Sequence, residues 1–228
     1  MDDWKQVTAL AFRRLSFAPP PEREMLTVND DGRFELWRSN GPIVGRFAGA
    51  VPDATALAAL VSAAAATPPP AVPSALPPDA ATEVVEVGDT SATVEAGEGA
   101  DGPWGELISA CRRLLDQLRD EPVAAVALVV ESPTGARLEH RGREPLPLEL
   151  DNATVAANVW HDGRQAGTFQ SDPLALGEVM ATPGWTSALA VDELTTPPGS
   201  LLVVSASFVV DDDGVYIPVR LSAPPLSL

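Results

Sequence analysis

The chain has one cysteine among its 228 residues, and this scarcity excludes a class of protein. A single cysteine, Cys111, cannot form an intrachain disulfide, so a disulfide-stapled secreted domain is excluded and a reducing compartment is expected. No stretch approaches the roughly eighteen consecutive apolar residues of a membrane-spanning helix. The N-terminus carries Asp2 and Asp3 and has no apolar core of an export signal. The sequence therefore predicts a cytoplasmic protein.

Signatures of common catalytic and cofactor sites are also scarce. We expect no nucleophile elbow, no Walker loop, no dinucleotide-binding glycine loop and no H-E-x-x-H zinc site. His140 and His161 are predicted to be surface histidines at hairpin turns, and Cys111 a small buried apolar residue. No catalytic, cofactor-binding or metal-binding residue is predicted, and no cofactor is expected.

Positive charge is missing from two long windows of the sequence. The net charge is −17, and no cation lies between Arg46 and Arg112 or between Arg164 and Arg220, where nine and seven acids occur. Such a chain repels a phosphate backbone, so direct binding of nucleic acid is not expected. Two interpretations stay open: the acids keep the protein in solution, or they form an acidic face that attracts a basic protein partner.

Lysine is even rarer than histidine, with Lys5 as its one occurrence against fourteen arginines, a usage typical of a GC-rich bacterial genome. Lys5 belongs to residues 1–24, which we expect to form a helical arm followed by a proline spacer. Trp4 and Val7 lie on the apolar side of the expected helix, and Arg13 and Arg14 supply cations. The arm is expected either to pack on its own domain or to dock on a partner.

The body of the chain alternates apolar and polar residues between turn signals, which predicts antiparallel hairpins. Amphipathic spacing predicts helices over residues 54–66 and 103–119, and a third after Asp172 through Met180. Residues 185–194 are expected to form a short helix or a packed loop, and the proline-rich residues 67–81 a loop. The hairpins are expected over residues 25–39, 83–96, 123–141, 153–170 and 201–221.

The two halves of the sequence share a spaced pattern of tryptophan, glycine and phenylalanine. The first set is Trp37, Gly41, Gly45 and Phe47, and the second is Trp160, Gly163, Gly167 and Phe169. We therefore expect an α+β fold with two tandem copies of a β-hairpin, helix, β-hairpin unit, over residues 25–120 and 121–228.

One known family shares the order of elements expected in the first half. Residues 38–41, then 47–49 and an aspartate-led helix, resemble the small bacterial emfourin inhibitors of thermolysin-like proteases. The resemblance implies an inhibitor, and no residue role is transferred from it.

The hypothesis with most support from these patterns is a non-enzymatic protein-binding or accessory module of a bacterial system. It would use the acidic surface, the N-terminal helix or both, and its oligomeric state is open. The alternatives are an inhibitor or immunity-type protein that blocks a basic active site, and an enzyme whose site is assembled from distant residues. The candidate partner-binding residues are Trp4, Val7, Arg13, Arg14, Glu83, Glu86, Glu95, Asp211, Asp212 and Asp213.

Overall fold

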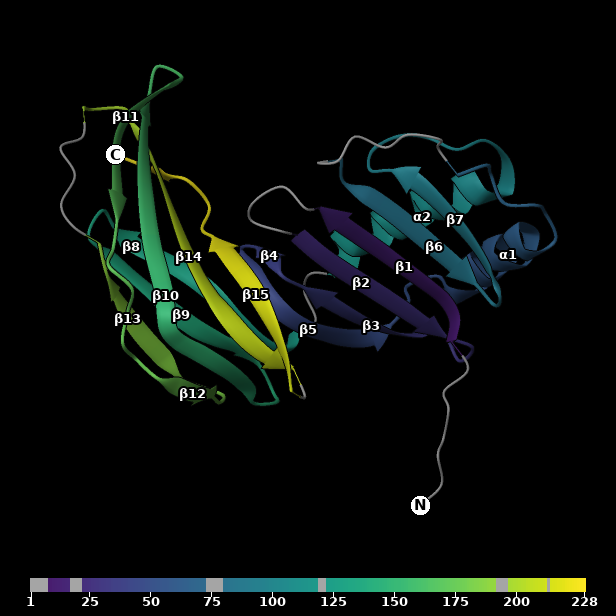
Figure 1. Cartoon of the computed structure of the whole chain (residues 1–228), viewed down its shortest axis with the longest axis horizontal. Helices are drawn as coiled ribbons and strands as arrows, with labels where there is room; N and C mark the ends of the chain where they lie inside the picture. The colour runs from purple at the N-terminus through teal and green to yellow at the C-terminus, as the bar shows by residue number, and fades with distance from the viewer. Residues whose placement is uncertain (1–7, 17–21, 73–79, 119–121, 192–196, 213) are drawn as a thin grey trace. The chain divides into compact units, whose positions relative to one another are not determined.

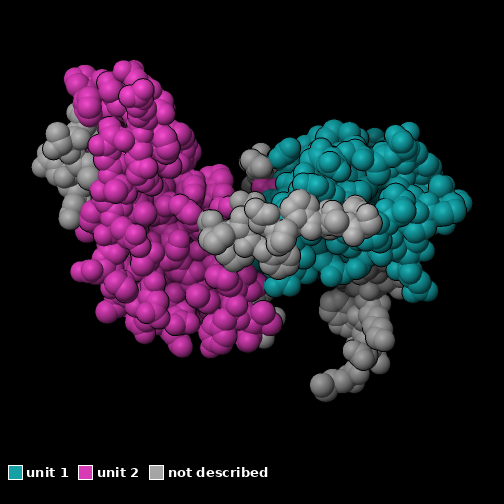
Figure 2. All heavy atoms as spheres, turned by 45° about the horizontal axis from the view of Figure 1, so that its top comes forward, with its two compact units in different colours: residues 1–37, 46–121 teal, residues 38–45, 122–228 magenta. Residues whose placement is uncertain are grey.

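The computed structural model describes the chain except residues 1–7, 17–21, 73–79, 119–121, 192–196 and 213. The described residues are mostly β-sheet with two helices, so the fold belongs to the α+β class (Figure 1). The chain divides into two compact units, coloured separately in Figure 2. Unit 1 comprises residues 1–37 and 46–121, and unit 2 comprises residues 38–45 and 122–228.

Unit 1 is an antiparallel sheet with two helices on one face (Figure 1). Its strands lie in the order β5, β3, β2, β1, β6, β7. The elements are β1 (Thr8–Ser16), β2 (Glu22–Asn29), β3 (Arg33–Arg38), β5 (Ile43–Ala50), α1 (Ala54–Ala65), β6 (Thr82–Val87), β7 (Thr90–Glu95) and α2 (Gly102–Gln117). Residues 46–50 of β5 belong to this unit, and residues 43–45 belong to unit 2.

The core of unit 1 forms where the inward face of the sheet meets α2. Phe12, Leu26 and Val85 are neighbours across β2, β1 and β6 and are fully buried. The predicted apolar stripe of α2 is confirmed, because its buried residues recur at helical spacing. They include Trp104, Leu107, Ile108, Cys111, Leu114 and Leu115.

Unit 2 is built from two layers of strands. The larger sheet has the order β11, β10, β14, β15, β4, with β12 beside β10 and β16 beside β14. It lies in front of β8 and β9 in Figure 1, and the smaller layer has the order β13, β9, β8 and then residues 43–45 of β5. The strands are β4 (Asn40–Gly41), β8 (Pro122–Ser132), β9 (Gly135–Gly142), β10 (Leu146–His161), β11 (Arg164–Gln170), β12 (Glu178–Ala181), β13 (Thr186–Ala190), β14 (Leu201–Asp212), β15 (Val215–Ser222) and β16 (Leu226–Ser227).

The core of unit 2 lies between these layers. Alternate residues of the long strand β10, such as Val155 and Val159, are buried, as are Val204 of β14 and Val126 of β8. The residues between them on β10 are partly or fully exposed, which is the period of two expected for a sheet with one buried face.

The predicted N-terminal helix is wrong over residues 8–16, which form β1. Leu10 and Phe12 point to the core while Ala9 and Ala11 lie on the other face, so the segment has the period of a strand. Apolar residues are frequent enough here to fit either period, and pairing with β2 on one side and β6 on the other decides for the strand. Residues 1–7 of the arm, which include Trp4 and Val7, lie outside the described residues. Residues 17–21, which include the proline spacer, also lie outside them.

The predicted helix after Asp172 is also wrong, because residues 178–181 form β12 and residues 171–177 form no helix. Gly177 adopts a positive φ of 71°, and its N–H donates to Asp151 Oδ1 at 2.7 Å. Pairing of β12 with β10 therefore replaces the helix. Residues 186–190, expected in a short helix or loop, form β13, which pairs with β9.

The tandem repeat is not confirmed. The second half contains no helix among its described residues, whereas the first half contains both helices. Trp37 is buried at 7% exposure and Trp160 is 41% exposed. Gly45 has φ 127° and lies against the backbone of Ala124, while Gly167 has no positive φ. The shared spacing therefore does not produce equivalent environments.

Candidate functional site

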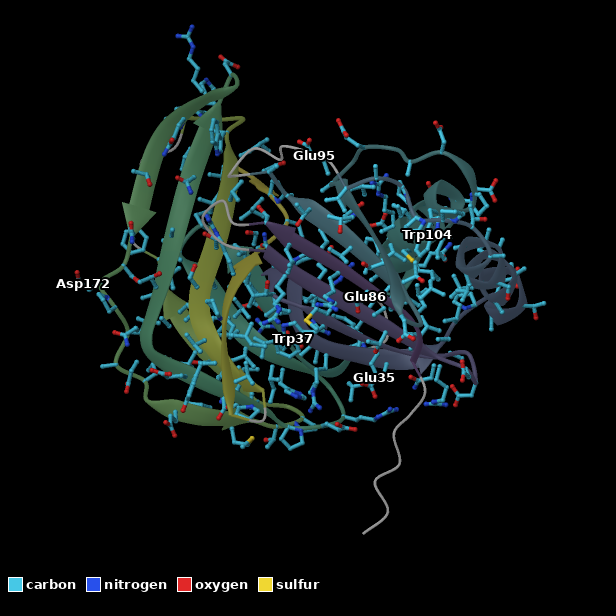
Figure 3. The ribbon with its side chains drawn as sticks, turned by 45° about the vertical axis from the view of Figure 1, so that its right-hand side comes forward. Glu35, Trp37, Glu86, Glu95, Trp104 and Asp172 are labelled. Carbon is cyan, nitrogen blue, oxygen red and sulfur yellow. The ribbon has the colours of Figure 1, made fainter. Side chains whose placement is uncertain are left out.

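Four of the candidate partner-binding residues of unit 1 lie on two adjacent strands that pair with each other. Arg13 and Arg14 lie on β1, and Glu83 and Glu86 lie on β6. Arg14 and Glu83 are direct register partners, and they lie on the side of the sheet that faces the helices. Arg13 and Glu86 form an ion pair on the opposite face, where Glu86 is labelled in Figure 3. The sequence-based hypothesis placed the arginines on the N-terminal arm and the glutamates on a separate acidic surface. Pairing of β1 with β6 brings them together.

Glu83 has no exposed surface and is held by two arginines. Its Oε1 lies 2.8 Å from Arg14 Nη2, and its Oε2 lies 2.6 Å from Arg112 Nη2 on α2. Arg14 Nη1 also lies 3.0 Å from Glu24 Oε2. Burial lowers the pKa of Arg14, but the hydrogen bond and charge of Glu83 and the charge of Glu24 outweigh burial and raise it. The cluster fastens α2 to the sheet, and the Glu83 carboxylate does not reach the protein surface.

The other candidate acids lie apart from this cluster. Glu95 is half-buried on β7, where it lines a pocket of about 480 Å³ with Pro68, Pro70 and Trp104. Asp211 Oδ1 accepts a hydrogen bond from Gly214 N at 2.7 Å, which closes the β14–β15 turn as predicted. The side chain of Asp212 and residue 213 lie outside the part of the chain that the structure describes.

Cys111 does not have the environment of a reactive thiol. It is fully buried on α2, and burial together with the negative charge of Glu83 raises its pKa to about 12. At neutral pH the thiol stays protonated and without access to solvent, as the sequence predicted for a small apolar core residue.

His161, Ser200 and Asp162 lie close together in unit 2 but lack the arrangement of a hydrolase triad. Ser200 Oγ lies 3.4 Å from His161 Nδ1, and His161 Nε2 lies 3.5 Å from Asp162 Oδ2. Ser200 is fully buried, and its hydroxyl donates to the carbonyl of Pro197 at 2.7 Å. The single hydroxyl proton is directed away from the histidine, so Ser200 is not prepared for nucleophilic attack.

One glycine spacing contradicts the expectation that no dinucleotide-binding glycine loop occurs. Gly97, Gly99 and Gly102 have the spacing G-x-G-x-x-G between β7 and α2, and sequence analysis missed it. The strand context differs from a nucleotide-binding unit, because β7 pairs antiparallel with β6. Acids also surround the loop, which opposes phosphate binding; they are Glu95, Glu98, Asp101 and Glu106.

The same glycines have structural roles. Gly97 and Gly102 adopt positive φ angles of 86° and 68°. Gly105, in the first turn of α2, is a further glycine with a structural role. A Cβ atom at this position would lie 1.6 Å from the carbonyl oxygen of Ala100, so the close contact between the loop and the helix requires glycine here.

A further apolar feature of unit 1 is the helix α1 with the groove beside it. No residue of α1 is charged, and Leu57 and Ala64 are its buried residues. A groove of about 460 Å³, here called the α1 groove, runs between α1 and the β2–β3 turn. Its residues are Ala9, Leu10, Val28, Asn29, Asp30, Asp31, Gly32, Ala54, Thr55, Leu57, Ala58, Val61 and Ser62.

The α1 groove joins an apolar interior to an acidic end. Leu10 and Leu57 are buried at its base, and Ala58 is exposed along its side. Asp30 and Asp31 are exposed at the turn, and the N-cap residue Asp53 is exposed at the start of α1. The signal for this site was present in the sequence, because the predicted helix over residues 54–66 contains no charged residue.

Comparisons with known proteins do not assign the site. No protein-family model matches the chain, and neither curated proteins nor solved structures show significant similarity to it. Among the described residues, no three histidine, cysteine, aspartate or glutamate side chains gather as metal ligands. No helix in the described part of the chain has the length and apolar character needed to cross a bilayer.

Proposed function

We propose that this protein is a non-enzymatic protein-binding module that holds a segment of its partner in the α1 groove. The observation that carries the proposal is an exposed helix without a single charge, bordered by an apolar groove, in a chain of net charge −17. Exposed helices ordinarily carry charged residues on their outer face, and a charge-depleted apolar patch is typical of interaction sites.

The shape and chemistry of the groove describe the segment that would fit. The exposed Ala58 and the half-buried Val61 offer apolar surface in the groove to one or two apolar side chains. Asp30 and Asp31 lie where a neighbouring cation would be attracted. We therefore assign the partner as a protein segment with an apolar anchor next to an arginine or lysine. This agrees with the sequence-based hypothesis of a basic partner, but it transfers the contact from Glu83 and Glu86 to the acids beside α1.

The test compares two substitutions on neighbouring residues of α1. Ala58 lines the α1 groove, whereas Ala59 is also exposed but lines neither this groove nor the pocket between α1 and α2. Arginine has a high helix propensity, so both Ala58→Arg and Ala59→Arg should keep the helix. Ala58→Arg would fill the groove and repel a basic segment.

Affinity capture with each immobilised protein, followed by quantitative mass spectrometry, gives the readout. A partner retained by the wild type and Ala59→Arg, and lost from Ala58→Arg, supports the proposal. Equal capture by both variants would assign the contact to another surface. Assay of the captured partner with and without this protein then separates an inhibitor from an accessory module.

A further inference from the structure

One end of the larger sheet of unit 2 brings two acids face to face. Glu149 of β10 and Glu178 of β12 are direct register partners on adjacent antiparallel strands (Figure 1). Side chains in such positions lie on the same face of the sheet, and like charges directly opposite each other destabilise it. Glu178 is exposed and Glu149 is half-buried, so both carboxylates are accessible from outside.

The sheet supplies no cation to relieve this repulsion. The strands β10, β12 and β14 contain no arginine or lysine. The single cation of β15, Arg220, has its Nη2 3.4 Å from Ser205 Oγ. Within the part of the chain that the structure describes, neither glutamate of the facing pair forms an ion pair. The two charges therefore face each other without a counter-charge.

An exposed apolar side chain lies beside the facing glutamates. Met180 follows Glu178 by two residues on β12, so the two side chains share a face. Met180 is 55% exposed, and it pairs with Pro147 of β10. This end of the sheet therefore combines negative charge with apolar surface.

The same surface continues onto β14 and β15. Val209 of β14 pairs with Glu149, and Asp211 lies two residues further along the same face. Tyr216 of β15 pairs with Asp211 and is 61% exposed. We call this surface the β12 face, and it is defined by Pro147, Glu149, Glu178, Met180, Asp211 and Tyr216.

We propose that the β12 face binds a basic protein segment, with an arginine or lysine between Glu149 and Glu178 and an apolar side chain against Met180. Charge complementarity carries the assignment, because a cation of the partner supplies the counter-charge that the sheet lacks. Methionine and tyrosine, the exposed residues beside the acids, are enriched in protein interfaces. The net charge of −17 attracts a basic partner and repels an acidic one. This inference is independent of the α1 groove, which belongs to unit 1.

The free protein tests whether the facing glutamates lack a counter-charge. Glu178→Gln removes one of the two charges, so the melting temperature should rise by about 1–3 °C, and by less in about 1 M salt. Glu98→Gln makes the same chemical change at an exposed acid between β7 and α2, and it should leave the melting temperature unchanged. A lower melting temperature for Glu178→Gln would make Glu178 a residue that stabilises the fold, and would overturn the proposal.

Binding is measured by NMR on the isotope-labelled full chain, with a synthetic peptide of alternating arginine and leucine as the probe. The amide signals of Glu178–Ala181 and Glu149 should shift on addition of the peptide. The dissociation constant measured from these signals should rise severalfold in Glu178→Gln and stay unchanged in Glu98→Gln. A peptide of the same charge with serine in place of leucine should bind more weakly, because it cannot cover Met180.

The same spectra separate this proposal from the α1 groove. Signals of Asp30 and Ala58 report binding in the groove, so either site can fail while the other is confirmed. Absence of shifts on β12, or equal affinity of the wild type and Glu178→Gln, would overturn the proposal. The same shifts with calcium chloride alone, at matched ionic strength, would assign the two carboxylates to a metal ion instead of a protein partner.

Discussion

Arg14 and Glu83 lie directly opposite each other on β1 and β6, with Arg14 Nη2 2.8 Å from Glu83 Oε1. The Arg112 guanidinium binds the other carboxylate oxygen of Glu83 from α2. One buried acid therefore joins a strand near the N-terminus, a strand 69 residues later and the helix that covers both. The acid is part of the framework that holds unit 1 together.

Substitution of Glu83 should be far more destabilising than substitution of Glu86. Glu83→Gln leaves two arginines without their buried counter-charge, and breaking such a pair costs about 3–5 kcal/mol. The side chains of Arg13 and Glu86 are 40% and 37% exposed, and pairs of this kind contribute about 0–1 kcal/mol. Urea unfolding monitored by tryptophan fluorescence gives both values. Equal losses in the two variants would contradict the framework role of Glu83.

The thiol of Cys111 should make stability depend on alkaline pH. Its pKa is raised by burial from 9.0 to about 12, so the unfolded chain loses the thiol proton at a lower pH than the folded chain. The stability contributed by this group is complete below pH 9 and is lost as pH rises from 9 to about 12. The unfolding free energy of Cys111→Ala should fall less over this window than that of the wild type. Parallel pH profiles would show that another group is responsible.

The same burial predicts the reactivity of the thiol. A thiol reagent at pH 8 should label the native protein slowly and the urea-unfolded protein rapidly, because only the unfolded chain exposes the sulfur and forms thiolate readily. Rapid labelling of the native protein would mean that α2 separates easily from the sheet.

The two aspartates that precede the helices should differ in their effect on stability. Asp53 Oδ1 accepts a hydrogen bond from Ala56 N at 3.0 Å, so Asp53→Ala should cost about 0.5–2 kcal/mol. Asp101 makes no capping hydrogen bond with its side chain, and Asp101→Ala should cost less. Thermal unfolding of both variants distinguishes them. Equal effects of the two substitutions would contradict the capping role of Asp53.

Neutralising the acidic end of the α1 groove should reduce the salt dependence of partner binding. The screening length falls from about 10 Å at 0.1 M salt to about 3 Å at 1 M, so association with a basic segment should slow as salt is added. Asp30→Asn should lower the association rate and flatten this dependence, and Asp89→Asn in the β6–β7 turn should not. Surface plasmon resonance with the captured partner measures both. A rate independent of salt would leave the acids as a solubility feature.

The sequence by itself determined the elements whose signals are local. The apolar stripe of α2 and the β14–β15 hairpin depend on residues within a few positions of one another, and both were predicted correctly. The hairpins β6–β7 and β8–β9 follow from the same short-range alternation. The α+β class was therefore accessible without coordinates.

Only the tertiary structure decided which strands pair and which charges meet. Residues 8–16 fit either a helix or a strand, and residues 172–180 were expected to form a helix; in both cases pairing with distant strands determined the outcome. The burial of Glu83 also arises from register between segments far apart in the chain. Local propensities differ by fractions of a kcal/mol per residue, so they cannot outweigh the hydrogen bonds and apolar burial that a paired strand contributes.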